Sequence, residues 1–224
     1  MKRTIFFLGM VLLSFSFKPL KAQTTSSGFY IGARYLPTIS DFKMKQVNGD
    51  FYKTSTVLGY GIGGLIGVNL SDHIGLQGEV LYSALAQNYV DATNTERRID
   101  LNYINIPLMV VLNTNSSSVV NLNVTAGPQL GILVGSEFDA TGGMAGDTVT
   151  AVFAAKSGDF GIAYGAGIDF NVLPNFSIDL GYRGVIGLVD ISDQSKTLTT
   201  DQYYILDRSH LMTYAAYVGV KLKF

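Results

Sequence analysis

Two histidines and a few nearby acids are the residues best suited to acid–base catalysis. His210 follows Ser209, and Asp207 and Glu137 lie in segments that we expect to be neighbouring loops. A hydrolase needs a nucleophile and a base within hydrogen-bond reach, with a third group that orients the base. Adjacent strand residues point to opposite faces, so the Ser209–His210 pair does not supply that geometry. We interpret His73 as a polar turn residue and expect no catalytic residue.

Motifs for cofactors and metals are equally weak. The stretch "GYGIGG" (residues 59–64) matches the G-x-G-x-x-G of dinucleotide-binding folds, and Glu79 follows at a suitable distance. That fingerprint requires a strand, a turn and a helix, whereas residues 65–70 continue a strand pattern. Asp139 and Asp147 have the side chains of calcium ligands, but their spacing fits no standard calcium loop. We therefore expect no cofactor and no metal.

Charged residues on the polar side of alternating segments form a more coherent group. Three acids and four bases recur there: Arg34, Glu79, Asp169, Asp179, Arg183, Lys221 and Lys223. In a closed barrel these side chains would point into the lumen, either lining a pore or pairing with one another as a plug. An unpaired buried charge is costly, and the interior of an eight-stranded barrel is only wide enough for side chains to fill it. The plug is the favoured interpretation.

The segments that position these charges alternate apolar and polar residues with period two, which indicates strands. Eight segments show this pattern: residues 28–37, 57–70, 74–87, 99–112, 119–134, 160–173, 176–189 and 211–224. No stretch has a convincing helical period. The sequence therefore predicts an all-β chain.

The connections between the segments alternate strictly between short and long. The short ones are residues 71–73, 114–118 and 174–175, and the long ones are residues 38–56, 88–98, 135–159 and 190–210. An antiparallel meander places all long loops at one end and all short turns at the other, as in outer-membrane barrels. We predict an eight-stranded antiparallel up-and-down transmembrane β-barrel with four extracellular loops, surrounded by outer-membrane lipid.

The first residues have a different character from the rest. A short basic start, an apolar core from Ile5 to Phe17 and a small residue at Ala22 are typical of a secretory signal peptide. We therefore divide the chain into a signal peptide (1–22) and a barrel domain (23–224). Removing residues 1–22 takes four of the 16 basic residues and none of the 17 acids, which leaves a net charge of −5. Nucleic acid is not an expected partner.

A soluble barrel of the lipocalin type is the rival architecture, with its apolar faces turned inward. The polar faces, however, make a poor surface for water. The face made of Gly161, Ala163, Gly165, Gly167, Asp169 and Asn171 has small residues where a solvated surface would have Lys and Glu. The apolar faces have Phe and Tyr near the strand ends, like the aromatic girdles of lipid-embedded barrels. The membrane barrel is favoured.

The last segment, "YVGVKLKF", alternates up to the final residue. Chain ends fray unless they are held, so this strand is expected to pair with the first strand and close the barrel. Its outward row resembles the C-terminal signal by which insertion machinery recognises outer-membrane proteins: Tyr214, Val218, Val220, Leu222 and Phe224.

Several segments resemble successive strands of the PorT-like outer-membrane β-barrel family of the Bacteroidetes type. They are "GFYIGARY", "IGLQGEVLYS", "LNYINIPLMVVL", "TAGPQLGILV", "YGAGIDF" and "FSIDLGYRGVIGL". The most specific pieces are the Tyr-x-x-Ile-Pro-Leu of residues 103–108 and the Gly-Pro-Gln of residues 127–129. The resemblance covers almost the whole mature chain and implies an envelope-complex component, since PorT-like proteins are thought to serve secretion.

The expected function is binding or structural. A rigid barrel with a filled lumen would present its four long loops to an extracellular or envelope partner, because recognition usually resides in such loops. Residues 135–159 form the longest and least charged loop, and they are our first choice for partner contact. Two alternatives stay open, a small porin for passive diffusion and an outer-membrane lipid-modifying enzyme.

Overall fold

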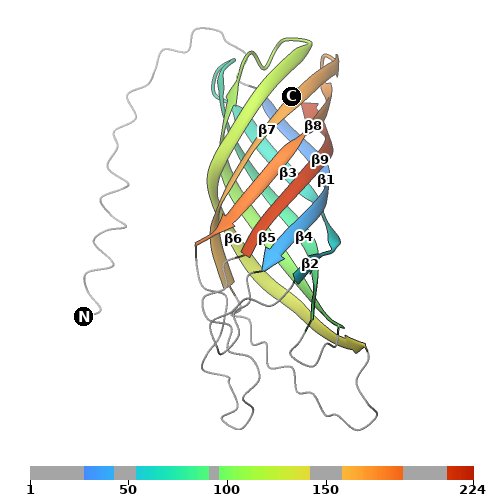
Figure 1. Cartoon of the computed structure of the whole chain (residues 1–224). Coiled ribbons are helices and arrows are strands. Elements are labelled where there is room, and N and C mark those ends of the chain that lie inside the picture. The colour runs from blue at the N-terminus through green and yellow to red at the C-terminus, as the bar shows by residue number, and fades with distance from the viewer. Residues whose placement is uncertain (1–27, 43–53, 91–95, 142–157, 189–210) are drawn as a thin grey trace, which may run out of the picture.

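The computed structural model describes residues 28–42, 54–90, 96–141, 158–188 and 211–224 (Figure 1). The predicted signal peptide lies outside these residues, as do the central parts of all four long connections. Within the described residues, no helix is long and apolar enough to cross a membrane.

In the part of the chain that the structure describes, nine strands form one closed antiparallel sheet. They are β1 (Phe29–Phe42), β2 (Thr54–Thr56), β3 (Leu58–Asn69), β4 (Ile74–Val90), β5 (Glu96–Asn113), β6 (Val120–Thr141), β7 (Gly158–Leu173), β8 (Phe176–Gly187) and β9 (Leu211–Lys223). Each long strand pairs with its neighbours in the chain, and β1 pairs with β9. The short β2 and the long β3 pair with the same side of β4. They therefore occupy one position in the wall, and the barrel has eight strand positions. The predicted eight-stranded barrel is confirmed.

The last strand closes the wall as the sequence predicts. On one side the ladder runs from Tyr30 opposite Lys223 to Phe42 opposite Leu211, and on the other side β9 pairs with β8. The backbone N–H of Phe224 donates to the oxygen of Phe29 at 2.8 Å. The terminal residues are therefore held from both sides.

The short turns lie at one end of the barrel, and the strand ends that the long connections join lie at the other (Figure 1). The start of β1 and the C-terminus are both at the short-turn end. This arrangement follows from the alternation of short and long connections, and it gives every strand the tilt and direction of an up-and-down meander.

The predicted loop boundaries are wrong in part. Residues 38–42, 88–90, 96–98 and 135–141 belong to strands, and β2 lies within the predicted loop 38–56. The β5–β6 ladder continues to Glu96 opposite Thr141, whereas the β6–β7 ladder stops at Ile132 opposite Gly158. The wall is therefore taller along β4, β5 and β6, and β6 runs past its neighbour β7 (Figure 1). Backbone pairing continues here without the apolar alternation on which the sequence prediction relied.

The two faces of the wall differ in composition. Outward positions are exposed and apolar, such as Ile62, Leu108 and Val220. Inward positions are buried, and they divide the lumen into two levels. The charged residues gather in a polar half nearer the short turns. Nearer the long loops lies a more apolar half with Leu36, Leu81, Leu85, Leu101, Tyr103 and Val185, which also contains buried polar residues such as Ser83, Gln87 and Gln129. The apolar half was not predicted.

Candidate functional site in the lumen

Strand register brings the charged residues of distant segments to one level of the lumen. Gly219 of β9 is the ladder partner of Arg34 on β1 and of Asp179 on β8. A Cβ on Gly219 would lie 2.7 Å from Cγ of Arg34. The glycine therefore leaves the space through which the Arg34 side chain crosses β9 to reach Asp179.

Glu79 is the centre of the network. Arg34 Nη1 donates to its Oε1 at 2.6 Å, and Arg183 donates to both of its oxygens, Nη1 to Oε2 at 2.5 Å and Nη2 to Oε1 at 2.8 Å. Gln77 Nε2 donates to the same carboxylate at 2.5 Å. Glu79 is only 2% exposed. One buried carboxylate thus joins β1, β4 and β8 through two guanidinium groups.

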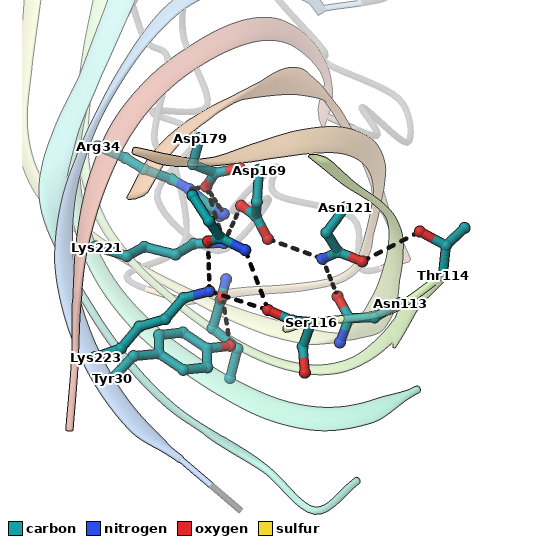
Figure 2. Close-up of polar contacts among 12 residues, drawn as sticks. Tyr30, Arg34, Asn113, Thr114, Ser116, Asn121, Asp169, Asp179, Lys221 and Lys223 are labelled. Atoms are coloured by element: carbon teal, nitrogen blue, oxygen red, sulfur yellow. Dashed lines mark hydrogen bonds and ion pairs between the residues drawn. The ribbon is translucent and has the colours of Figure 1, made fainter. Parts of the chain in front are cut away.

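Asp179 links this cluster to a second one nearer the short turns. Arg34 donates to Asp179 Oδ2 through Nη2 and, at 2.8 Å, through Nε. Lys221 Nζ lies 3.4 Å from the same oxygen and 2.7 Å from Asp169 Oδ1. Asn121 Nδ2 donates to Asp169 Oδ2 at 3.1 Å and to Asn113 Oδ1 at 2.8 Å. Figure 2 shows this path of contacts from Arg34 to Asn113.

Lys223 is the exception among the seven predicted charges. Its Nζ donates to Asn171 Oδ1 at 2.6 Å and to the backbone oxygen of Ser116 at 3.2 Å, both neutral acceptors. Asn171 Nδ2 also donates to the backbone oxygens of Ser116 and Ser118. Lys223 therefore fastens the 114–118 turn to β7 (Figure 2), while the other six charges form the ionic network.

Three further residues complete the network, and the sequence did not single them out as site residues: Tyr30, Gln77 and Tyr217. Tyr217 lies against Arg34, with the guanidinium carbon 4.3 Å from the ring centroid. Tyr30 donates its hydroxyl to Gln77 Oε1 at 3.0 Å. Their inward positions in the alternating pattern were visible, but their contacts depend on how the strands are staggered.

The network connects strands from distant parts of the chain across the lumen. Among the described residues, no group of three or more His, Asp or Glu side chains could hold a metal ion. His73 is exposed in its turn, with Nδ1 3.4 Å from the oxygen of Asn113. Asp207, Ser209 and His210 lie outside the described residues.

The outward row of β9 faces away from this network. Tyr214, Val218, Val220, Leu222 and Phe224 are all exposed, as the alternation predicts. At the rim, the rings of Phe224 and Phe29 lie with centroids 6.0 Å apart. First and last strands thus meet in an aromatic contact on the outer surface.

The sequence matches the model of the outer membrane protein beta-barrel domain family over residues 7–224. The chain belongs to this family. It is an outer-membrane β-barrel protein, so the apolar outward face of the wall meets lipid. Among curated proteins, none matches the sequence.

Solved structures of outer-membrane proteins are similar to this chain at low sequence identity. The outer membrane protein OprG from Pseudomonas aeruginosa is 11% identical with a TM-score of 0.57, and the alignment covers 89% of this chain and 97% of OprG. Ail, the attachment invasion locus protein of Yersinia pestis, is 16% identical with a TM-score of 0.43, covering 88% of this chain and 99% of Ail. Neisserial surface protein A is 17% identical with a TM-score of 0.45, covering 88% of this chain and 97% of the other. At these identities the OprG match supports the fold alone.

Proposed function

We propose that this barrel has a closed lumen and that its long-loop end binds a partner in the cell envelope, as the resemblance to PorT-like barrels implies. The observation that supports this proposal most is the lumen. Its polar half is crossed by the network around Glu79, and its apolar half is filled by two clusters. One consists of Leu36, Leu81, Ala215 and Tyr217, and the other of Met109, Ala163 and Val185. With both levels occupied by side chains, the loops are left as the part of the barrel suited to recognition.

The proposed contact surface is the taller side of the wall. Strands β4, β5 and β6 extend beyond the ends of β7 and β8, so the connections after β4 and β6 start furthest from the barrel centre. Within this extension Leu85 and Leu101 are buried, which gives the projecting strands a core of their own. A rigid projection limits the entropy that a loop loses when it binds. We propose the connection between β6 and β7 as the main contact.

Cross-linking in intact cells tests this proposal. A photoreactive residue placed within 142–157 is expected to capture a specific envelope protein, and replacing 142–157 by a Gly/Ser linker of equal length should abolish its recovery. The same photoreactive residue at 174–175, in the opposite turn, is the matched control and should not capture it. Equal capture from both positions, or capture that survives the linker replacement, would refute the proposed contact.

A small porin is the second candidate, because some buried polar atoms in the lumen have no protein partner. Both polar atoms of the Asn123 side chain, Ser177 Oγ and Arg183 Nε make no hydrogen bond among the described residues. Such groups usually bind water, and a chain of waters is the start of a conducting path. Liposomes that contain the protein distinguish the two functions. The closed barrel predicts no swelling in isotonic small sugars, whereas a porin predicts swelling that slows as the sugar becomes larger.

We also propose that the terminal row of β9 is read by the insertion machinery. Loss of one aromatic side chain should cost a finished barrel only about 1.5–3 kcal/mol. Loss of a recognition signal instead stops the chain before insertion. Deleting Phe224 is therefore expected to leave protease-sensitive chain in the periplasm, while Leu180→Ala, on the outward face of β8 and outside the row, should insert normally and unfold at lower temperature.

The readouts are the outer-membrane yield of each variant and its heat-modifiable mobility on a gel. Normal yield of folded barrel after deletion of Phe224 would show that the terminal stretch is only the last strand.

A further inference from the structure

Two sequence motifs outside the ionic network lie side by side in the wall. The Tyr-x-x-Ile-Pro-Leu motif is on β5 and the Gly-Pro-Gln motif is on β6, with Pro107 opposite Gln129. Both prolines lack the N–H that a ladder needs. After Pro107–Gln129 the next β5–β6 pair is Val110–Ala126. Regular pairing therefore lapses over two residues of each strand, inside the membrane-spanning part of the wall.

Pairing also lapses on the other side of β5. There the ladder passes from Gly78 opposite Leu108 directly to Leu81 opposite Asn105. At the same level β5 and β6 approach closely, because a Cβ on Gly127 would lie only 2.0 Å from the backbone oxygen of Leu108. Only glycine fits there. The two motifs therefore interrupt the regular pairing of the wall at this place, and the shape of the outer surface changes there.

A groove of about 550 Å³ lies on the outer face at this place. It forms because small residues, Gly78 and Ala126, are set among larger neighbours. Its walls include Ile66, Leu76, Leu108 and Pro128. The polar side chain in its lining, Gln77, is directed into the lumen, where it donates to Glu79. The volume falls within the range of small-molecule sites, about 300–1,000 Å³.

The surroundings of the groove identify what fills it. The outward face of this outer-membrane barrel is a lipid interface, and the groove is continuous with it, since Ile66 and Leu108 beside it are 52% and 61% exposed. The outer face of the groove offers no charged group, so a polar ligand would lose its hydration without compensation. A flexible, unbranched hydrocarbon chain can follow a narrow apolar cleft and gain dispersion contacts that a convex barrel surface does not provide.

We propose that this groove is a binding site for one acyl chain of a phospholipid in the leaflet at the short-turn side. Phe29 lies at the rim end of the groove, next to the aromatic contact with Phe224, and this places the lipid headgroup at the girdle. The bound chain exchanges more slowly than the lipid around the rest of the belt. The two proline motifs have the role of forming the groove.

Native mass spectrometry of the full mature protein, extracted in mild detergent, tests the proposal. The unaltered barrel should retain about one phospholipid per chain. Ala126→Leu combined with Gly78→Leu fills the groove, and the retained fraction should fall about tenfold, the change that corresponds to ~1.4 kcal/mol. Ala216→Leu is the matched control, because Ala216 is an exposed alanine on β9, far from the groove lining. It should retain the lipid.

Three results would overturn the proposal: no retained lipid in the unaltered protein, equal retention after the groove is filled, or a dimer of this chain that the groove substitutions disrupt. If the leucine variants fail to fold, fluorescence decides, because the chain contains no Trp. In detergent, Phe29→Trp at the groove should be quenched saturably by phospholipid brominated in its acyl chains. Phe170→Trp, on the outward face of β7, should be quenched only in proportion to the added lipid. Identical quenching curves would contradict the site.

Discussion

The polar and apolar halves of the lumen are filled by different physical interactions, although both consist of inward residues of the same barrel strands. In the polar half, Glu79, Asp169 and Asp179 are matched to cations from β1, β8 and β9. In the apolar half, leucine, methionine and valine side chains fill space by packing, and Tyr217 connects the two halves because its ring also lies against Arg34. The polar half therefore depends on each partner being present, and the apolar half depends on volume. Removing one group should reveal this difference.

The largest effect is expected from Glu79→Ala. The substitution leaves Arg34 and Arg183 buried without their shared carboxylate, and breaking such a pair typically costs about 3–5 kcal/mol. Urea unfolding of the barrel in lipid vesicles measures the loss. Adding Arg183→Met to Glu79→Ala should recover part of it, because one uncompensated charge is then removed. A loss below about 1 kcal/mol would mean that water or rearrangement replaces the carboxylate.

Leu81→Ala should cost somewhat less. Leu81 is 3% exposed and packs with Leu36, Ala215 and Tyr217. Truncating a buried leucine costs about 2–5 kcal/mol through lost burial and the cavity that remains, but it leaves no charge unpaired. The same unfolding assay applies. Leu81→Met, which keeps the volume, should restore most of the stability, and a failure to do so would show that the apolar half is not governed by packing.

The smallest effect is expected at Lys223, and Lys221 supplies the matched comparison. Lys223→Met removes hydrogen bonds to two neutral oxygens, worth about 1 kcal/mol each. Lys221→Met leaves the buried Asp169 without a cation and should cost about 3–5 kcal/mol. If both variants lose the same stability, then the ionic network does not distinguish the two lysines.

The sequence predicted the polar half better than the apolar half. Charged residues such as Arg34 and Asp169 interrupt apolar alternation, so their inward positions can be recognised from the chain alone. Leu81 lies between Val80 and Tyr82, and Met109 lies between Leu108 and Val110. Where both faces are apolar there is no alternation to read, so the filled apolar half could not be predicted.

The partners of each charge also could not be predicted. Arg34 meets residues 45 and 145 positions away in the chain, and which ones it meets is decided by strand stagger. Lys223 is an example. It lies on the same inward face of β9 as Lys221, but Lys221 donates to a carboxylate whereas Lys223 donates to neutral oxygens. The predicted positions of the loop boundaries were wrong for a third reason. Toward the long connections, β5 and β6 remain paired as far as Glu96 opposite Thr141 without an alternating apolar face.

Single-channel recording in a planar bilayer tests the central claim, that side chains close the lumen at two levels. The purified, unaltered protein is predicted to give no steady open channel. Replacing Glu79 and Arg183 together by alanine should still give none, because the apolar half stays closed. Adding Leu36→Ala and Leu81→Ala to that variant should create brief openings if the barrel still folds. A stable, ion-selective conductance from the unaltered protein would contradict the account and establish a porin.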